Sequence, residues 1–334
     1  MRVAINGFGR IGKLVFRAFL EKNLKGVDIV AINELGSIDS SLHLMQYDSI
    51  HGILPIEINK SKAGFKYKNK TIKFFSEKEP LNLPWKKLNV DVVLECSGVF
   101  ASKEKAGAHL TAGAKKVIIS APGSNVDATI VQGVNNQILK KKHNVISNGS
   151  CTTNCLAPVA MVLDKGVGIE NGFMTTVHSY TGDQRTVDQT HSDFRRARGA
   201  AISMIPTSTG AAKALSLVLP KLKGKLDGTA IRVPTPNVSL IDLTFTSKKK
   251  TSVEEINKLM VQASKTSKLK NILTTNKLPL VSIDFNHNSS SSVFDLTQTQ
   301  VLNSKFCRVL SWYDNEWGFS NRMLDTMLDF KKLL

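Results

Sequence analysis

The most constraining feature of this sequence is a glycine-rich turn between a short apolar run and an amphipathic segment. Val3 to Asn6 is followed by Gly7-Phe8-Gly9-Arg10-Ile11-Gly12, and apolar residues then recur at helical spacing. A second apolar run, Ile29 to Ile32, completes a strand–turn–helix–strand unit. In such a unit the three glycines permit a tight turn, close approach of a pyrophosphate and close helix–strand packing. The sequence therefore predicts a dinucleotide-binding βαβ unit.

An acidic residue closes this pattern. Glu34 ends the second apolar run, 22 residues after Gly12, close to the spacing that the dinucleotide fingerprint requires. A carboxylate there accepts hydrogen bonds from a free ribose 2′-hydroxyl and repels a 2′-phosphate. We therefore predict that the cofactor is NAD rather than NADP.

Further short runs of Val, Ile and Leu follow in the first half of the chain. They lie at 92–96, 117–119, 130–134 and 145–146. Such runs are typical of strands that are buried on both faces of a parallel sheet. We predict a doubly wound α/β domain of the Rossmann type, which binds NAD, over residues 1–150.

The second half has a different pattern. Leu240 to Thr246 alternates apolar and polar residues, as a half-solvated strand does. Further strands are predicted at 173–178, 230–233, 280–285, 292–296 and 306–312, with few helices between them. We predict an α+β domain over residues 151–316 with a mixed, largely antiparallel sheet covered on one side. An apolar stripe in residues 317–334 predicts a C-terminal helix, which we expect to pack back on the NAD-binding domain.

A reactive cysteine is predicted at the start of the second half. Cys151 lies near the N-terminus of a predicted helix, where the helix dipole favours a thiolate. A thiolate beside a dinucleotide site suggests a nucleophile that forms a covalent adduct with a carbonyl, making residues 151–316 the catalytic domain. Among seven histidines, His178 stands out because it ends a predicted strand and polar residues follow it. No HExxH or CxxC motif occurs, so we predict no metal site.

The composition and charge of the chain limit which classes of protein it can belong to. The 334 residues carry 45 Lys and Arg against 27 Asp and Glu, a net charge of +18, which suggests a polyanionic partner or anionic substrates. No RNA-binding motif, basic helix or aromatic-interleaved basic stretch occurs, so nucleic-acid binding is expected to be at most secondary. No apolar run is long enough for a membrane span. With four cysteines and no signal peptide, we expect a cytoplasmic protein with reduced thiols.

Six motifs together resemble one family, the phosphorylating glyceraldehyde-3-phosphate dehydrogenases of bacterial type. The resemblance runs from residue 3 to about residue 328, in the order of the family. The motifs are Asn6–Gly12, Ser150–Asn154, His178–Thr181, Ile205–Lys213, Arg232–Ser239 and Trp312–Gly318.

The resemblance implies a cytoplasmic, glycolytic homotetramer. The implied reaction converts D-glyceraldehyde 3-phosphate, inorganic phosphate and NAD to 1,3-bisphosphoglycerate and NADH. Cys151 is implied as the nucleophile that forms a hemithioacetal and then a thioester, with His178 as its base. We also expect an imidazolium at His178 to lower the pKa of the Cys151 thiol.

The resemblance also implies two sets of binding residues. The first set binds the substrate and phosphate groups and consists of Ser150, Thr152, Thr181, Arg195, Thr209, Gly210 and Arg232. The second set binds the cofactor and consists of Gly7, Gly9, Arg10, Ile11, Gly12, Glu34, Lys78, Ser120 and Asn315. The family commonly has Asp where Glu34 stands, which keeps the charge on a longer arm.

The alternative within the family is an erythrose-4-phosphate dehydrogenase. Asn33-Glu34-Leu35 and Asn286-His287 also occur in that branch. Tyr180-Thr181 and Thr209-Gly210 instead resemble the phosphate-binding residues of the triose enzyme. We therefore favour the triose phosphate as substrate.

Overall fold

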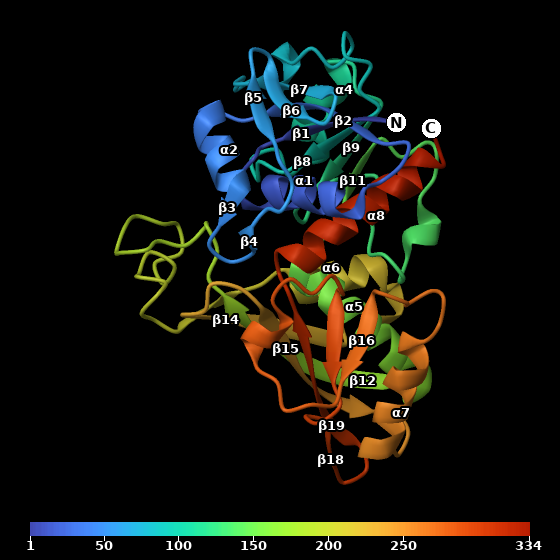
Figure 1. The fold of residues 1–334 in the computed structure, drawn as a ribbon. Coiled ribbons are helices and arrows are strands. Elements are labelled where there is room, and N and C mark those ends of the chain that lie inside the picture. The colour runs from blue at the N-terminus through green and yellow to red at the C-terminus, as the bar shows by residue number, and fades with distance from the viewer. The chain divides into compact units, whose positions relative to one another are not determined.

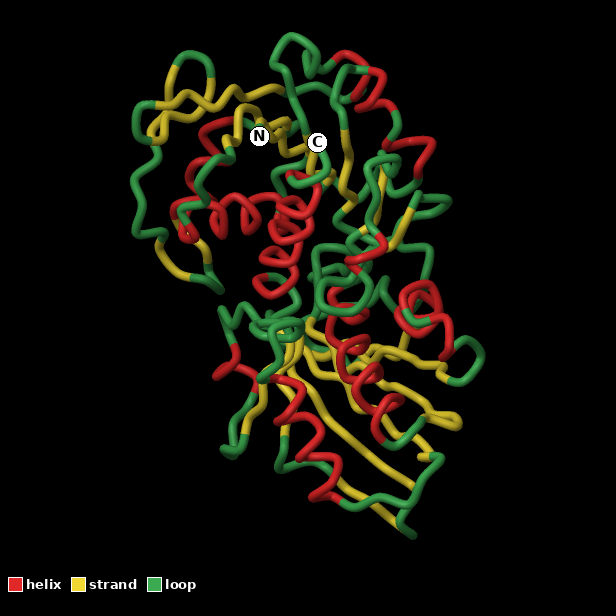
Figure 2. Tube along the Cα trace, turned by 90° about the vertical axis from the view of Figure 1, so that its right-hand side faces the viewer, coloured by secondary structure: helices red, strands yellow, loops and turns green.

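The computed structural model describes all 334 residues, and its chain divides into two compact units (Figure 1). Unit 1 comprises residues 1–130, 136–149 and 320–334, and unit 2 comprises residues 131–135 and 150–319. Both contain helices and strands (Figure 2). None of the helices is long and apolar enough to cross a membrane.

Unit 1 is built on a nine-stranded sheet in the order β10-β11-β9-β8-β1-β2-β7-β6-β5. Neighbours from β10 to β7 pair in parallel, and β7, β6 and β5 pair antiparallel. The strands are β1 (Arg2–Asn6), β2 (Asp28–Asn33), β5 (Asn59–Ser61), β6 (Gly64–Tyr67), β7 (Lys70–Phe75), β8 (Val92–Glu95), β9 (Lys116–Ile119), β10 (Ala128–Thr129) and β11 (Val145–Ser147). A separate hairpin joins β3 (Tyr47–Asp48) and β4 (Gly52–Ile53). The helices are α1 (Arg10–Lys22), α2 (Ile38–Gln46), α3 (Lys103–Ala106) and α4 (Ala108–Thr111).

The apolar runs of unit 1 are strands that are covered on both faces. Val3, Ala4 and Ile5 of β1 are all fully buried, as are the apolar residues of β8. The chain leaves β1 toward β2 on one side and returns through β8 on the other, so the strand order reverses at β1. Ligands of doubly wound sheets bind outside the carboxyl ends of the strands at this kind of reversal.

Unit 2 is built on an eight-stranded mixed sheet in the order β13-β14-β12-β15-β19-β17-β16, with β18 paired to β19. Two pairs, β12 with β14 and β16 with β17, are parallel and the others are antiparallel. The strands are β12 (Ile169–Ser179), β13 (Ile205–Ser208), β14 (Leu226–Val233), β15 (Ser239–Ser247), β16 (Leu273–Asn276), β17 (Ser292–Asp295), β18 (Gln300–Leu302) and β19 (Phe306–Tyr313). The helices are α5 (Cys151–Gly166), α6 (Ala211–Val218) and α7 (Val253–Ser264).

One face of the unit 2 sheet carries its core. Ile241, Leu243 and Phe245 of β15 are buried in a single apolar cluster with side chains of α5, α6 and α7. Asp242 and Thr244, which alternate with them, are only half-buried. The predicted mixed sheet covered on one side is therefore confirmed, as is the parallel α/β sheet of unit 1.

Two predicted strands are wrong. Residues 130–134 follow β10 as a buried turn, in which the Val134 N–H donates to the Val131 carbonyl at 3.1 Å and Gly133 has a φ of +76°. Residues 282–285 form a 3₁₀ turn, because the Asp284 carboxylate accepts the Val281 N–H at 2.9 Å and closes it. In residues 130–134 the apolar residues that predicted a strand are instead buried within a turn.

Two further segments lie outside the two sheets. Residues 180–204 form the long polar loop between β12 and β13, without helix or strand. Helix α8 (Trp317–Lys331) is the predicted C-terminal helix, and from Ser320 on its residues belong to unit 1. The division of the chain into functional domains at residues 150 and 316 stays a prediction.

Candidate active site

The glycine turn of unit 1 has the geometry that its sequence predicts. Gly7 has a φ of +84°, and a Cβ placed there lies 2.5 Å from the Cα of Ser97. A Cβ on Gly12 lies 2.1 Å from the Gly7 carbonyl oxygen, so both positions require glycine. A Cβ on Gly9 meets nothing within 4 Å, and Gly9 caps α1 without a side-chain hydrogen bond. The space beside Gly9 at the start of α1 is therefore open, and the N-terminus of a helix is a position that favours an anion.

A pocket of about 420 Å³ opens beside this turn at the carboxyl ends of β1, β2 and β8. The Glu34 carboxylate at its rim accepts the Phe8 N–H at 2.6 Å and the Gly36 N–H at 3.1 Å. These two bonds fix a carboxylate where ribose hydroxyls can donate to it. The residues of the pocket therefore fit NAD. They are Asn6, Gly7, Gly9, Asn33, Glu34, Leu35, Glu77, Lys78, Glu79, Cys96, Ser97, Val99 and Phe100.

The other predicted cofactor residues are divided between the two units. Lys78 lines the pocket, whereas Arg10 is exposed and forms an ion pair with Asp48 at 2.6 Å. Ile11 is half-buried in the first turn of α1. Ser120 follows β9 and lies outside the pocket lining. Asn315 belongs to unit 2.

A buried carboxylate beneath the pocket escaped the sequence analysis. Glu95, at the end of β8, accepts hydrogen bonds from Asn6 Nδ2 at 2.6 Å and from the Ser97 N–H at 2.8 Å. His109 Nε2 lies 2.9 Å from the same carboxylate, and Trp85 Nε1 donates to His109 Nδ1 at 3.0 Å. The sequence feature that could have indicated Glu95 is a charged residue inside an otherwise apolar strand. Through its hydrogen bonds Glu95 orders the backbone that lines the pocket.

In unit 2, α5 and β12 bring the predicted catalytic residues together. Ser150 caps α5, its Oγ accepting the Thr153 N–H at 3.0 Å, so Cys151 is the first residue of the helix. The Cys151 Sγ lies 3.5 Å from Nε2 of His178. His178 Nδ1 lies 2.7 Å from the Ser179 carbonyl oxygen and 3.1 Å from Arg232 Nη1, and the shorter contact favours donation from Nδ1 to the carbonyl. Nε2 is therefore the unprotonated nitrogen and can accept the thiol proton.

The charge state of this pair differs from the expectation. Burial raises the pKa of the Cys151 thiol, and the positive charge of Arg232 offsets part of this. Burial and the same charge lower the pKa of His178 to about 3. These shifts disfavour the expected imidazolium, because desolvation disfavours both charged forms and Arg232 repels a second cation. The direction of both shifts favours a neutral thiol and a neutral imidazole, and a neutral imidazole can accept a proton.

Arg232 supplies a half-buried positive charge beside this pair. It lies on β14, directly opposite His178 of β12 in the parallel register. Its Nη1 donates to the Ser179 carbonyl at 3.1 Å and to Thr181 Oγ1 at 3.4 Å. Its buried Nε has no partner, and no carboxylate forms an ion pair with it. A guanidinium without a counter-charge is a site for an anion.

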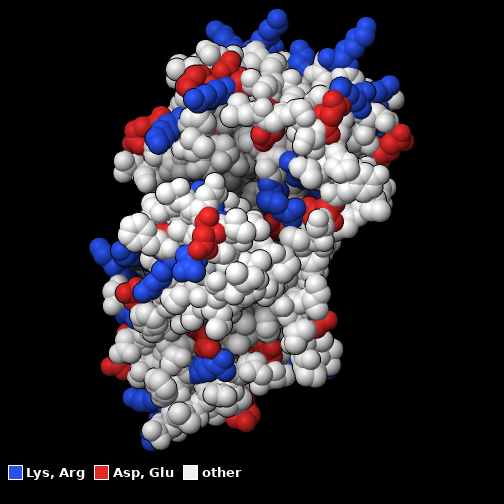
Figure 3. All heavy atoms as spheres, turned by 90° about the vertical axis from the view of Figure 1, so that its left-hand side faces the viewer, with Lys and Arg blue, Asp and Glu red and all other residues white.

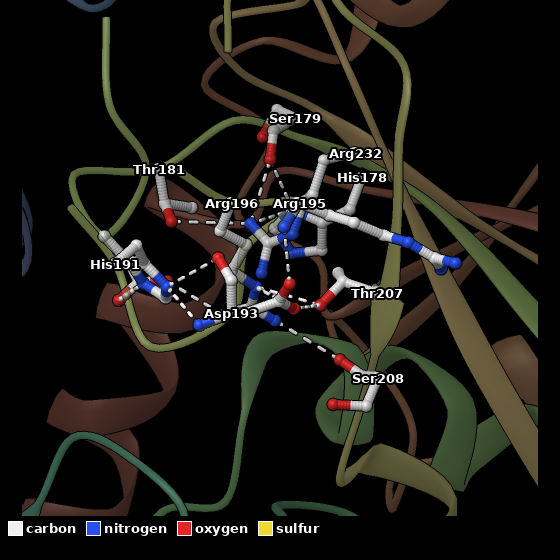
Figure 4. Close-up of polar contacts among 11 residues, drawn as sticks. His178, Ser179, Thr181, His191, Asp193, Arg195, Arg196, Thr207, Ser208 and Arg232 are labelled. Carbon is white, nitrogen blue, oxygen red and sulfur yellow. Dashed lines mark hydrogen bonds and ion pairs between the residues drawn. The ribbon is translucent and has the colours of Figure 1, made fainter. Parts of the chain in front are cut away.

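The polar loop brings Arg196 to this region (Figure 4). Arg196 forms an ion pair with Asp183 at 2.8 Å and its Nε donates to Thr207 Oγ1 at 3.0 Å. Its charge helps to lower the pKa of Arg232. Arg195 is exposed, its guanidinium contacts the Pro206 carbonyl at 3.5 Å, and Figure 4 shows it directed away from the cluster. No periodicity could indicate which arginine of this irregular loop faces inward.

The remaining predicted phosphate-binding residues flank helix N-termini. Thr152 Oγ1 is already hydrogen-bonded to Tyr313 Oη at 2.9 Å. Thr209 Oγ1 accepts the Ala211 N–H at 3.2 Å, and Gly210 caps α6 in open space. Asn315 Oδ1 accepts hydrogen bonds from two serine hydroxyls, described below. No group of three or more His, Cys, Asp or Glu side chains is arranged to hold a metal ion.

Comparison with known proteins gives matches over both units. Residues 1–103 match the family model of the glyceraldehyde 3-phosphate dehydrogenase NAD binding domain, and residues 150–315 match that of the C-terminal domain. The chain is 56% identical to a glyceraldehyde-3-phosphate dehydrogenase of Xanthobacter flavus over 333 residues, which is 100% of this chain and 99% of the relative. It is 53% identical to that of Pseudomonas aeruginosa over 329 residues, 98% of this chain and 97% of the relative.

The matched residues include the glycine turn, the cysteine–histidine pair and the arginine of β14. The NAD-binding assignment of the first residues, made from the glycine turn and Glu34, agrees with the family model. The chain belongs to the glyceraldehyde-3-phosphate dehydrogenase family.

Proposed function

We propose that the chain catalyses the NAD-dependent oxidation and phosphorylation of D-glyceraldehyde 3-phosphate to 1,3-bisphosphoglycerate. The observation that carries this proposal is the contact of 3.5 Å between Cys151 Sγ and His178 Nε2. This contact pairs a nucleophile with a base whose other nitrogen is committed to a carbonyl.

The first step forms the bond between Cys151 and the substrate. The sulfur attacks the aldehyde carbon while its proton passes to Nε2 of His178 and on to the aldehyde oxygen. The product is a neutral hemithioacetal, so this step leaves no net charge on Cys151 or His178. Since His178 starts neutral, it can accept the proton without first losing one.

The second step oxidises the hemithioacetal. Bound NAD supplies the acceptor for the hydride. As the hydride leaves, His178 Nε2 takes the hydroxyl proton and a thioester remains on Cys151. An oxygen of inorganic phosphate then attacks the thioester carbon, the carbon–sulfur bond breaks, and the departing sulfur regains its proton from His178.

The substrate phosphate is proposed to bind at Arg232 and Thr181. Both groups lie together, 3.4 Å apart, and the guanidinium lacks a counter-charge. An anionic substrate supplies that charge, which orients the three-carbon chain between Arg232 and Cys151. The second phosphate is proposed to bind near the N-terminus of α6, at Thr209 and Gly210.

An absorbance assay for NADH tests the activity. We expect turnover of glyceraldehyde 3-phosphate that requires both NAD and inorganic phosphate, and a much lower kcat/KM with NADP. A higher kcat/KM for erythrose 4-phosphate would overturn the choice of substrate in favour of the tetrose branch of the family. Turnover that is independent of phosphate would overturn the acyl-transfer step.

Labelling tests the nucleophile directly. Iodoacetamide should modify the peptide that contains Cys151 first, because Cys155 is buried and its pKa is raised to about 12. Cys151→Ser should lower kcat/KM by about 10³-fold or more while NAD binding is retained. Retained turnover in this variant would exclude the covalent mechanism.

We further propose that the chain assembles as a homotetramer in the cytoplasm. The polar loop exposes four large apolar side chains, Val187, Phe194, Ile202 and Met204, each at least 73% exposed. Several large apolar side chains exposed on one loop are typical of a protein interface. Phe194→Asp should reduce the mass measured by light scattering, whereas the same substitution of the more remote exposed Leu302 should not. An unchanged mass for Phe194→Asp would exclude this loop from the interface.

A further inference from the structure

Ser179, the last residue of β12, connects three parts of the site. It is fully buried. Its carbonyl accepts hydrogen bonds from His178 Nδ1 at 2.7 Å and Arg232 Nη1 at 3.1 Å. Its hydroxyl donates to Asn315 Oδ1 at 2.8 Å, and its N–H donates to Ser239 Oγ at 3.0 Å. One residue therefore contacts the base, the substrate-binding cation and the residue predicted to hold the nicotinamide carboxamide.

The amide of Asn315 is oriented by two serines. Ser239 Oγ accepts the Ser179 N–H, which leaves its proton free to donate to Asn315 Oδ1 at 2.9 Å. With the Ser179 hydroxyl also donating to it, Oδ1 has two donors and Nδ2 points away from both serines. Asn315 therefore presents N–H donors, which complement the carbonyl oxygen of a carboxamide.

The two functions of Ser179 use different atoms. The backbone carbonyl selects the tautomer of His178, and the side-chain hydroxyl helps to select the orientation of Asn315. The carbonyl is independent of the side chain, so the two functions can be separated by mutation.

We propose that Ser179 is a positioning residue that sets the Asn315 amide toward the nicotinamide through its hydroxyl and the His178 tautomer through its carbonyl. The proposal rests on the proposed function, in which His178 is the base and Asn315 binds the carboxamide. It assigns the Ser179 hydroxyl to cofactor orientation alone.

Ser179→Ala tests the assignment, because it removes the hydroxyl and keeps the carbonyl. Calorimetry should show the Kd for NAD raised about fivefold, the factor that loss of one typical hydrogen bond gives. The pH profile of Cys151 alkylation without NAD should stay unchanged, since the contact of His178 with the carbonyl is intact. An unchanged Kd, or a displaced pH profile, would overturn the proposal.

A double-mutant cycle distinguishes positioning from general disorder. If Ser179 acts through Asn315, adding Ser179→Ala to Asn315→Ala should not raise the Kd further. An additional fivefold rise in that background would show that the serine acts by another route and would overturn the proposal. Ser239→Ala removes the other donor and should raise the Kd in the same direction, which keeps the test available if Ser179→Ala does not fold.

Ser311→Ala is the matched control. Ser311 is a fully buried serine of the same sheet, and its hydroxyl bonds to Ser292 Oγ at 2.7 Å rather than to Asn315. Its variant should bind NAD like the wild type, and an equal loss of affinity would overturn the specific role of Ser179. Inactivity of the wild type toward glyceraldehyde 3-phosphate would instead contradict the proposed function, whatever the variants bind.

Discussion

Arg232 acts on both members of the catalytic pair through one charge. It lowers the pKa of the Cys151 thiol and also lowers the pKa of His178. The same guanidinium therefore makes the nucleophile easier to ionise and keeps its base unprotonated. Desolvation opposes a stable ion pair of Cys151 thiolate and His178 imidazolium. The two effects therefore help the reaction together only if the proton leaves the sulfur while the sulfur attacks the substrate.

Arg232→Gln should separate these effects. Without the positive charge, the pKa of Cys151 rises further and that of His178 rises toward its usual range. The pH at which iodoacetamide reacts at half its maximal rate should therefore increase. A curve that stays in place or shifts to lower pH would contradict this electrostatic role. Arg198→Gln, at an exposed arginine paired with Asp188, is the control and should leave the curve unchanged.

His178 should also make stability depend on pH. Its folded pKa is lowered from 6.5 to about 3, so the unfolded chain binds a proton that the folded chain rejects. This contribution is complete above pH 6.5 and is lost as pH falls toward 3, by up to about 1.4 kcal/mol per pH unit. Urea unfolding between pH 6.5 and 4 should therefore show a smaller acid-induced loss in His178→Asn than in wild type. Equal losses would show that His178 is protonated in the folded protein.

At the scale of elements, the turn between β1 and α1 is set by two glycines for different reasons. Gly7 needs a positive φ and lies against the backbone of Ser97, whereas Gly9 faces open space. Glycine at position 7 is required by the fold itself, whereas glycine at position 9 leaves room for a ligand.

Alanine substitutions should distinguish these reasons. Gly7→Ala should destabilise the protein by more than about 1 kcal/mol, because the added Cβ collides with backbone and the φ is unfavourable. Gly9→Ala should unfold at nearly the wild-type temperature but bind NAD more weakly, since its methyl group occupies space above the first turn of α1. Melting temperature and calorimetric Kd check this pair, and equal stability losses would contradict it.

The sequence predicted the helices and strands better than it predicted the side-chain contacts in the site. Apolar runs identified most strands of both sheets, because burial on two faces leaves a continuous pattern and burial on one face leaves an alternating one. The pattern failed at residues 130–134 and 280–285, where hydrogen bonds close turns that apolar content hides. Cys151 and His178 could be predicted from their positions at element ends. The hydroxyl of Ser179 could not, because only the register of β12, β15 and β19 brings it to Asn315.

At the scale of the whole molecule, the charge of +18 has a limited connection with the site. On the face shown in Figure 3, basic side chains are interspersed with acidic ones rather than gathered in one patch. Within the site the positive charges near the base are those of Arg232 and Arg196, and Arg196 is paired with Asp183. We therefore expect the surplus to act at long range, as a field that attracts anions.

Such a field makes the reaction sensitive to salt. Raising ionic strength from about 10 mM to 150 mM shortens the screening length from about 30 Å to 8 Å. The kcat/KM for the anionic aldehyde should fall over this range, with kcat nearly constant because the reacting groups are buried. A fall in kcat with constant kcat/KM would place the salt effect on a step after substrate capture. Replacing chloride by acetate at equal ionic strength controls for specific ions.

The parallel pairing of β12 with β14 fixes the distance between two residues of the site. His178 and Arg232 occupy opposing positions of one ladder, so the separation of base and cation is set by the spacing between neighbouring strands. Backbone hydrogen bonds along the ladder hold that spacing, and changes in the surrounding loops do not alter it. We therefore expect the lengths of the side chains at these two positions, rather than the surrounding loops, to set how far the base lies from the cation.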